Sequence, residues 1–193
     1  MGRQDHDRVS GSLLLTHGAG ANADAPLLLA VDEALTAAGV SVSRYTLPYR
    51  RARPHGPPRA GDPERDRAGI REAAAALGPR PFLGGHSYGG RQCSMLASDE
   101  PDFAAGLLLL SYPLHPPRDR KNLRTAHFPN LRTPALFIHG ARDPFGSPEE
   151  MNAALRLIPS PTKLVIVDRA GHDLRVPHIG SLVADAFRWL SSL

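Results

Sequence analysis

The chain has 193 residues, of which 41% are hydrophobic, and this is enough for one domain with a real apolar core. No apolar run approaches the roughly 20 residues that cross a bilayer, and the stretch Met1–Asp7 is polar, so neither a membrane span nor a signal peptide is expected. The single cysteine, Cys93, excludes an internal disulfide and fits a reducing compartment. We therefore expect one domain over residues 1–193, located in the cytoplasm.

The formal net charge is +4, and its distribution argues against a nucleic-acid partner. Segment 50–71 contains seven arginines and three acidic residues, an excess of four that accounts for the whole net charge. The segment is rich in proline and glycine. A surface that binds single-stranded nucleic acid carries aromatic side chains on which the bases stack, and no aromatic residue alternates with these arginines. A solvated loop is the simpler interpretation, with a phosphate-binding patch as the alternative.

Segments with the character of strands and helices alternate along the chain. Short apolar or β-rich runs predict buried strands at 13–15, 40–45, 81–84, 105–111, 135–139 and 163–167. Helical spacing, prolines at helix starts and capping residues predict helices over 26–38, 62–77, 92–99, 148–157 and 178–190. Segments 48–61 and 112–133 are expected to be irregular. Because most strands are continuous apolar runs, we expect an α/β fold with a parallel sheet covered by helices on both faces.

A serine lies between the third of these strands and the helix after it. Gly85, Ser87 and Gly89 form a Gly-x-Ser-x-Gly pattern, which is typical of the nucleophile elbow, a sharp strand-to-helix turn that exposes the serine hydroxyl. The glycines are needed because side chains at these positions would collide with the strand and the helix. The pattern also occurs by chance in loops, but here a strand precedes it and a helix follows. Ser87 is therefore the candidate nucleophile.

An acid and a base follow two later strands. A serine nucleophile needs an imidazole to take its proton, and the imidazole needs a carboxylate to fix its tautomer. Asp143 follows the fifth predicted strand and His172 follows the sixth, which gives the order Ser…Asp…His expected of an α/β-hydrolase. Asp168 is the second choice for the acid. We interpret the remaining candidates as structural residues: Glu149, Glu150, His86, His139 and His178.

The loop after the first strand supplies the last element of such a site. An acyl-transfer enzyme needs N–H donors for the oxyanion, and one is expected from Tyr88, directly after the nucleophile. The sequence His17-Gly18-Ala19-Gly20 has the form of the second donor loop, and we assign the second N–H to Ala19. The alternative is that these glycines only make a tight turn.

These motifs resemble those of small, lidless α/β-hydrolases related to dienelactone hydrolases, and more narrowly of the testis-expressed protein 30/KANSL3-like hydrolase group. The segments that carry the resemblance are 16–21, 84–91, 112–117, 139–146 and 171–172. The resemblance implies a minimal fold of about six mostly parallel strands and cleavage of a small ester or related acyl bond through an acyl-enzyme. We expect a small-molecule acyl substrate, no cofactor or metal, no nucleic-acid or membrane partner, and a monomer or weak homodimer.

The sequence departs from that group in two respects. Dienelactone hydrolases use a cysteine nucleophile, whereas the elbow residue here is Ser87 and Cys93 is expected in the core. The antiparallel strands that usually precede the first donor loop do not fit in ten residues, so the sheet is expected to be truncated.

Two other functions stay open from the sequence. One is a non-catalytic interaction module on the hydrolase fold. The other is a dinucleotide-binding Rossmann protein, because Gly18, Gly20 and Ala23 match the GxGxxG/A pattern after a strand. No acidic residue ends the second strand, where Arg44 stands instead, and only a 2′-phosphate would suit that arginine.

Overall fold

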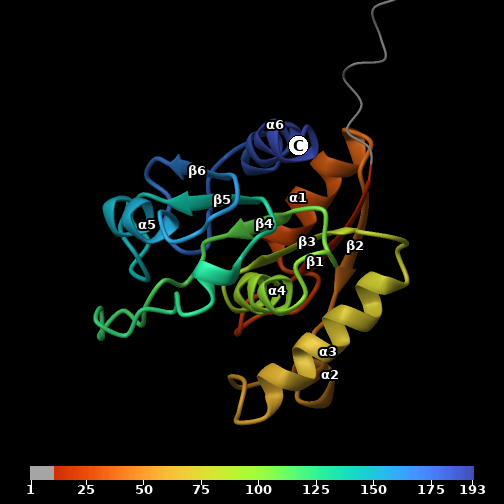
Figure 1. Ribbon diagram of the computed structural model, residues 1–193, viewed down its shortest axis with the longest axis horizontal. Coiled ribbons are helices and arrows are strands. Elements are labelled where there is room, and N and C mark those ends of the chain that lie inside the picture. The colour runs from red at the N-terminus through yellow and green to blue at the C-terminus, as the bar shows by residue number, and fades with distance from the viewer. Residues whose placement is uncertain (1–10) are drawn as a thin grey trace, which may run out of the picture.

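Residues 11–193 are described by the computed structural model, and they form one six-stranded sheet with helices on both faces (Figure 1). The strands are β1 (Ser12–Thr16), β2 (Ser41–Tyr45), β3 (Phe82–His86), β4 (Leu107–Leu110), β5 (Ala135–Gly140) and β6 (Thr162–Val167). The helices are α1 (Pro26–Ala37), α2 (Pro48–Ala52), α3 (Asp62–Ala75), α4 (Tyr88–Asp99), α5 (Pro148–Leu155) and α6 (Ile179–Ser191), with a 3₁₀ turn η1 (Phe128–Asn130). Every neighbouring pair of strands is parallel, so the fold class predicted from the sequence is confirmed.

Alternate residues of the strands point to opposite faces and so build two separate core layers. Leu13 and Leu15 face α1 and α6, whereas Leu14 faces the side covered by α3, α4 and α5. Figure 1 shows α1 and α6 together on one side of the sheet and α3 and α4 on the other. The central strands β1, β3, β4 and β5 are almost wholly buried, while the edge strands β2 and β6 are half-buried. The continuous apolar runs in the sequence reflect this double coverage.

The strand order places the site. The order is β2-β1-β3-β4-β5-β6, so the chain moves in one direction from β1 to β2 and in the other from β3 onward. In an open parallel sheet such a reversal leaves a crevice at the carboxyl ends of the two strands beside it, where ligands bind. Here those strands are β1 and β3. The loop after β1 begins with His17, and Ser87 directly follows β3.

One predicted irregular segment is partly helical. We expected 48–61 to lack regular structure, but Pro48–Ala52 forms the short helix α2. Proline at the first helical position suits this start, because its fixed backbone angle and missing N–H cost nothing there. The 50–71 segment is therefore not one solvated loop: Arg50 is buried, and the segment continues into α3.

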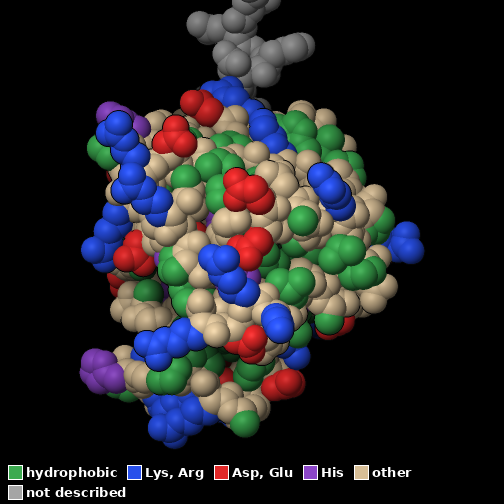
Figure 2. Space-filling model, turned by 90° about the vertical axis from the view of Figure 1, so that its left-hand side faces the viewer, with side chains coloured by type: hydrophobic (Ala, Val, Ile, Leu, Met, Phe, Trp, Pro, Cys, Tyr) green, Lys and Arg blue, Asp and Glu red, His purple; other side chains and the backbone are tan. Residues whose placement is uncertain are grey.

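Two further findings concern the helices and the surface of the protein. None of the helices formed by residues 11–193 combines the length and the apolar character that crossing a bilayer requires. Figure 2 shows the face on the α5 and β6 side, where basic and acidic side chains are interspersed from top to bottom with hydrophobic ones between them.

Candidate active site

Ser87 occupies a strained turn between β3 and α4. Its backbone has φ 50° and ψ −114°, a conformation that side-chain-bearing residues rarely adopt and that costs about 1–3 kcal/mol. The main chain fixes this conformation because the Ser87 N–H donates to the Leu110 carbonyl over 2.8 Å. A Cβ atom on Gly85 would lie 2.6 Å from the Gly90 nitrogen, so this glycine is required for the close approach of strand and helix.

Ser87, His172 and Asp143 form one hydrogen-bonded series. The Nε2 atom of His172 lies 2.8 Å from Ser87 Oγ, and its Nδ1 atom lies 3.0 and 2.9 Å from the two Asp143 carboxylate oxygens. With the Nδ1–H donating to the carboxylate, Nε2 is left to accept the serine proton. The Asp143 side chain is fully buried, whereas that of His172 is 19% exposed.

Short local contacts bring the two loops that carry Asp143 and His172 together. The Arg142 N–H donates to the Ala170 carbonyl over 2.8 Å, which ties the end of β5 to the loop after β6. Within the first loop, the Phe145 N–H donates to Asp143 Oδ1 over 2.9 Å, as in an Asx turn. The Phe145 ring packs on the His172 ring with 4.3 Å between centroids. The carboxylate and the imidazole therefore face each other in a fixed geometry.

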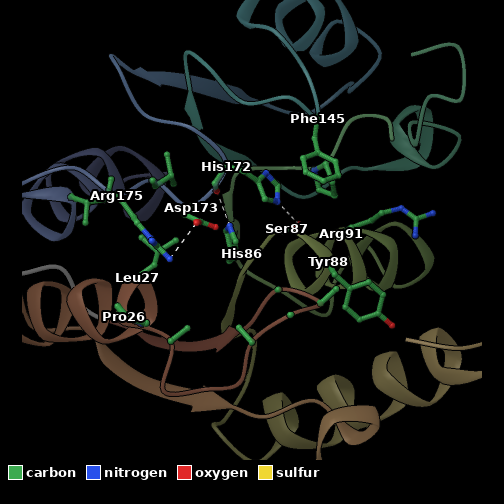
Figure 3. Close-up of a pocket in the computed structure, with 18 of the residues that line it drawn as sticks. Pro26, Leu27, His86, Ser87, Tyr88, Arg91, Phe145, His172, Asp173 and Arg175 are labelled. Carbon is green, nitrogen blue, oxygen red and sulfur yellow. Dashed lines mark hydrogen bonds and ion pairs between the residues drawn. The ribbon is translucent and has the colours of Figure 1, made fainter. Parts of the chain in front are cut away.

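The predicted oxyanion donors line the same cavity as Ser87. Ala19 and Tyr88 both belong to the lining of a cavity of about 1050 Å³ that opens above the serine (Figure 3). Tyr88 is the first residue of α4, so its N–H has no acceptor within the helix. The Ala19 N–H makes no hydrogen bond to any residue in the described range 11–193. Both donors are thus free to meet a ligand oxygen.

Residues from α2 and α3, which the sequence did not single out, hold the two donor segments. Arg50 donates from a terminal nitrogen to the Ala19 carbonyl over 2.7 Å and from Nε to the Ala21 carbonyl over 2.9 Å. The Tyr49 hydroxyl donates to the same Ala19 carbonyl over 2.8 Å. The buried Asp66 carboxylate accepts from the Tyr88 hydroxyl over 2.7 Å, and burial raises the pKa of this carboxyl. These contacts fix the Ala19 loop on one side and the Tyr88 side chain on the other.

The competing acids and bases do not reach the serine. Asp168 is exposed, and it is Asp143 that contacts His172. Glu150 accepts the Ser147 N–H in a capping box at the start of α5. His139 is buried and its Nε2–H donates to the Gly146 carbonyl over 2.8 Å. Cys93 is buried in the core, and burial raises the pKa of its thiol to about 12, so it is not poised as a nucleophile.

Arg44 argues against dinucleotide binding. It pairs with Asp24 over 2.6 Å and with Asp32 over 2.9 Å, so its charge is already neutralised by the protein. The described residues 11–193 also contain no group of three or more His, Cys, Asp or Glu side chains arranged to hold a metal ion.

A parallel sheet of this order, with a strained serine at the turn from its third strand into a helix, is the arrangement of the α/β-hydrolase class. Comparison with known protein families agrees with this assignment. The model of the alpha/beta hydrolase domain family matches residues 9–185, and the chain belongs to that family.

Solved structures with the same fold include three named enzymes. Dienelactone hydrolase from Anabaena variabilis is 21% identical, with a TM-score of 0.72 over 94% of this chain and 85% of that one. Est1E from Butyrivibrio proteoclasticus is 17% identical, with a TM-score of 0.73 over 97% and 90%. The monoacylglycerol lipase from Paleococcus ferrophilus is 19% identical, with a TM-score of 0.73 over 94% of both chains. At these identities the likeness establishes the fold.

Proposed function

We propose that this protein is a serine hydrolase that cleaves a small ester or related acyl bond through an acyl-enzyme intermediate. Ser87 is the nucleophile, His172 the general base and acid, and Asp143 the carboxylate that orients the imidazole. The N–H groups of Ala19 and Tyr88 form the oxyanion hole. The observation that carries the proposal is the hydrogen-bonded series from Asp143 through His172 to Ser87, which ends inside an open cavity.

The chemistry follows from this geometry. Ser87 Oγ attacks the acyl carbon while its proton moves to Nε2 of His172, and the carbonyl oxygen gains the negative charge that the two N–H groups stabilise. Collapse breaks the bond to the leaving alcohol, which takes the proton from Nε2, and leaves the acyl group on Ser87. Water then gives its proton to Nε2 and adds to the acyl carbon. The second collapse releases the acid and returns the proton to Ser87.

The finer features of the proposal have separate support. Ester specificity of the carboxylesterase kind is supported by the hydrogen-bonded series at Ser87 and by the fold shared with Est1E, a monoacylglycerol lipase and a dienelactone hydrolase. The narrower grouping with the testis-expressed protein 30/KANSL3-like hydrolases rests on the motifs at 16–21, 84–91 and 139–146. A cytoplasmic location rests on the single, unpaired cysteine.

Activity-based labelling tests the proposal. A fluorophosphonate should label the purified protein, and Ser87→Ala should abolish both labelling and hydrolysis of p-nitrophenyl butyrate. Ser94→Ala is the matched control, since Ser94 is a buried serine on the same helix that bonds to the Arg91 carbonyl. Unlabelled wild-type protein without esterase activity would instead favour a non-catalytic interaction module.

A further inference from the structure

The cavity above Ser87 has two unlike sides. One side is mainly apolar and is built by the start of α1 and the loop that leads into α6, which also carries the Asp173–Arg175 ion pair; its apolar residues are Pro26, Leu27, Leu174, Val176 and Ile179. The other side contains Arg91 on α4 and Arg124 on the connection between β4 and β5. In Figure 3, Pro26 and Leu27 lie on one side of His172 and Ser87, and Arg91 lies on the other. The reacting group of a bound substrate would lie between an apolar and a charged region.

The charges of the cavity are strongly unbalanced. Its lining includes four arginines and a single acidic residue, Asp173. That aspartate pairs with Arg175 over 3.4 Å, which accounts for one of the four. Across residues 11–193, none of the other three, Arg59, Arg91 and Arg124, forms an ion pair with a carboxylate. Two positive charges on the same side of the cavity are therefore left without a counterion from the described part of the protein.

Arg91 and Arg124 are close enough to affect each other. Burial, followed by the positive charge of Arg91, lowers the pKa of the Arg124 guanidinium. Of the Arg124 nitrogens, Nη1 makes one long contact, 3.4 Å, to the Pro113 carbonyl. The Arg91 side chain interacts with the Tyr112 hydroxyl, while its buried Nε atom makes no hydrogen bond within the described range. Nearby His127 adds no positive charge near neutral pH, because burial and Arg91 lower its pKa to about 4.

Two adjacent like charges without a counterion are unfavourable. An oxyanion bound between the guanidiniums would offset this repulsion, since a guanidinium offers several N–H groups in a fork that matches carboxylate and phosphate oxygens. The main chain already holds the pair in place. The Arg91 N–H donates to the Ser87 carbonyl over 3.0 Å, one helical turn from the nucleophile. The Arg124 carbonyl accepts from the buried Tyr112 hydroxyl over 2.6 Å.

We propose that Arg91 and Arg124 form an anion subsite that binds a carboxylate or phosphate group of the substrate, while the Pro26 and Leu27 side receives an uncharged hydrocarbon part. The inference rests on the proposed function and narrows it: the substrates are esters that carry a negative charge on one arm. Both arginines lie outside the arginine-rich segment 50–71, which contributes Arg59 to the same cavity lining.

A kinetic experiment tests the selectivity. The values of kcat/KM are measured for monoethyl adipate and for 4-butanoyloxybutanoate, which place the carboxylate on the acyl and on the alcohol arm. Each is compared with its neutral primary amide, which contains the same single ester bond. We expect one anionic ester to be preferred over its neutral partner by about tenfold or more, the range of a charge-assisted contact. Arg91→Gln and Arg124→Gln should each reduce this preference by about tenfold, mainly through KM. Arg118→Gln, an exposed arginine of the same connection outside the cavity lining, should keep it.

A binding experiment keeps this inference separate from the proposed function. Ser87→Ala protein is titrated calorimetrically with hexanoate, hexyl phosphate and hexanamide. Binding of either anion at least about tenfold tighter than the amide, lost in Ser87→Ala/Arg124→Gln, supports the subsite, and the tighter of the two identifies the anion. Equal binding of all three overturns it. If the wild-type protein is neither labelled nor active but the anion binds, the catalytic proposal fails and the anion subsite stands. If esters are cleaved without any preference for charge, the catalytic proposal stands and the anion subsite fails.

Discussion

The Nε2–H of His86 donates to the main-chain carbonyl of His172 over 2.9 Å, so the residue before the proposed nucleophile holds the loop that carries the proposed base. The two imidazole rings also pack together, with 5.1 Å between centroids. Burial lowers the pKa of His86 and so favours its neutral ring. Its Nδ1 faces Gly18, where a Cβ atom would lie only 2.8 Å from that nitrogen. His86 is thus a positioning residue between the β1 loop and the His172 loop.

Replacing His86 should slow catalysis without weakening substrate binding. In His86→Ala the His172 carbonyl loses its donor, and the imidazole is no longer held at the distance that Ser87 needs. We expect kcat to fall by about tenfold or more, with KM changed little, because small misplacements of a reacting group are costly. His86→Gln, whose amide still donates, should recover part of the rate. A rise in KM with kcat unchanged, or no recovery in His86→Gln, would contradict a positioning role.

Asp143→Asn should lower the rate by about two to four orders of magnitude while the fold is retained, as expected when the imidazole loses its orienting carboxylate. The amide cannot accept the Nδ1–H with the same strength, and its NH₂ group favours the wrong tautomer. Asp168→Asn is the matched control, because Asp168 is exposed and nearer to His172 in the sequence. Esterase rates of both variants decide which aspartate orients the imidazole, and circular dichroism checks that each variant keeps its fold. Near-full activity of Asp143→Asn together with loss in Asp168→Asn would reverse the assignment.

The order of Ser87, Asp143 and His172 could be derived from the sequence because each residue follows an apolar strand. Parallel strands bring their carboxyl ends to one edge of the sheet, so three distant positions become neighbours without any knowledge of side-chain packing. The same reasoning predicted the sheet and the two covered faces. The Gly-x-Ser-x-Gly pattern added the strained turn, because its glycines have a steric cause that is local.

The residues that support this site could not be derived in the same way. Arg50 is one of seven arginines in segment 50–71, and nothing local distinguishes the buried one from the exposed ones. Helix α2 has only five residues, too few to show helical periodicity, and Pro48 at its start was the one available signal. The role of Asp66 depends on where α3 packs against Tyr88, which is a tertiary relationship.

Gly85→Ala should destabilise the protein strongly, whereas Gly20→Ala should not. A Cβ atom on Gly85 would lie 2.6 Å from the Gly90 nitrogen and 2.7 Å from the Gly89 carbonyl carbon, and backbone atoms cannot move aside as the end of a side chain can. We expect a loss of about 1–3 kcal/mol or more in the free energy of unfolding, as in other overpacked sites. No atom lies within 4 Å of a Cβ atom built on Gly20, so its alanine variant should stay within about 0.5 kcal/mol. Urea unfolding measures both, and similar losses in the two variants would contradict the steric explanation.

The free energy of unfolding should fall as the pH is lowered from about 6.5 toward 4, and His17 should cause part of the loss. Burial lowers the pKa of this imidazole from 6.5 to about 4. Its Nδ1–H donates to the Gly18 carbonyl over 2.8 Å, and its Nε2 accepts the Leu47 N–H over 3.0 Å. A second proton would have to bind at the accepting Nε2, so it breaks the bond to Leu47 as well as charging a buried ring.

The sign of the effect follows from linkage. Because the pKa of His17 is lower in the folded protein than in the unfolded chain, the unfolded chain binds more protons between pH 6.5 and 4, and stability rises with pH in this window. The full effect of the shift is about 3 kcal/mol, present above pH 6.5 and lost by about pH 4. Urea unfolding at several pH values should show a shallower dependence for His17→Gln than for the wild type, with the two curves converging as the pH falls. His55→Gln, which replaces an exposed histidine, should follow the wild-type curve. Parallel curves for wild type and His17→Gln would show that protonation of His17 does not drive the acid instability.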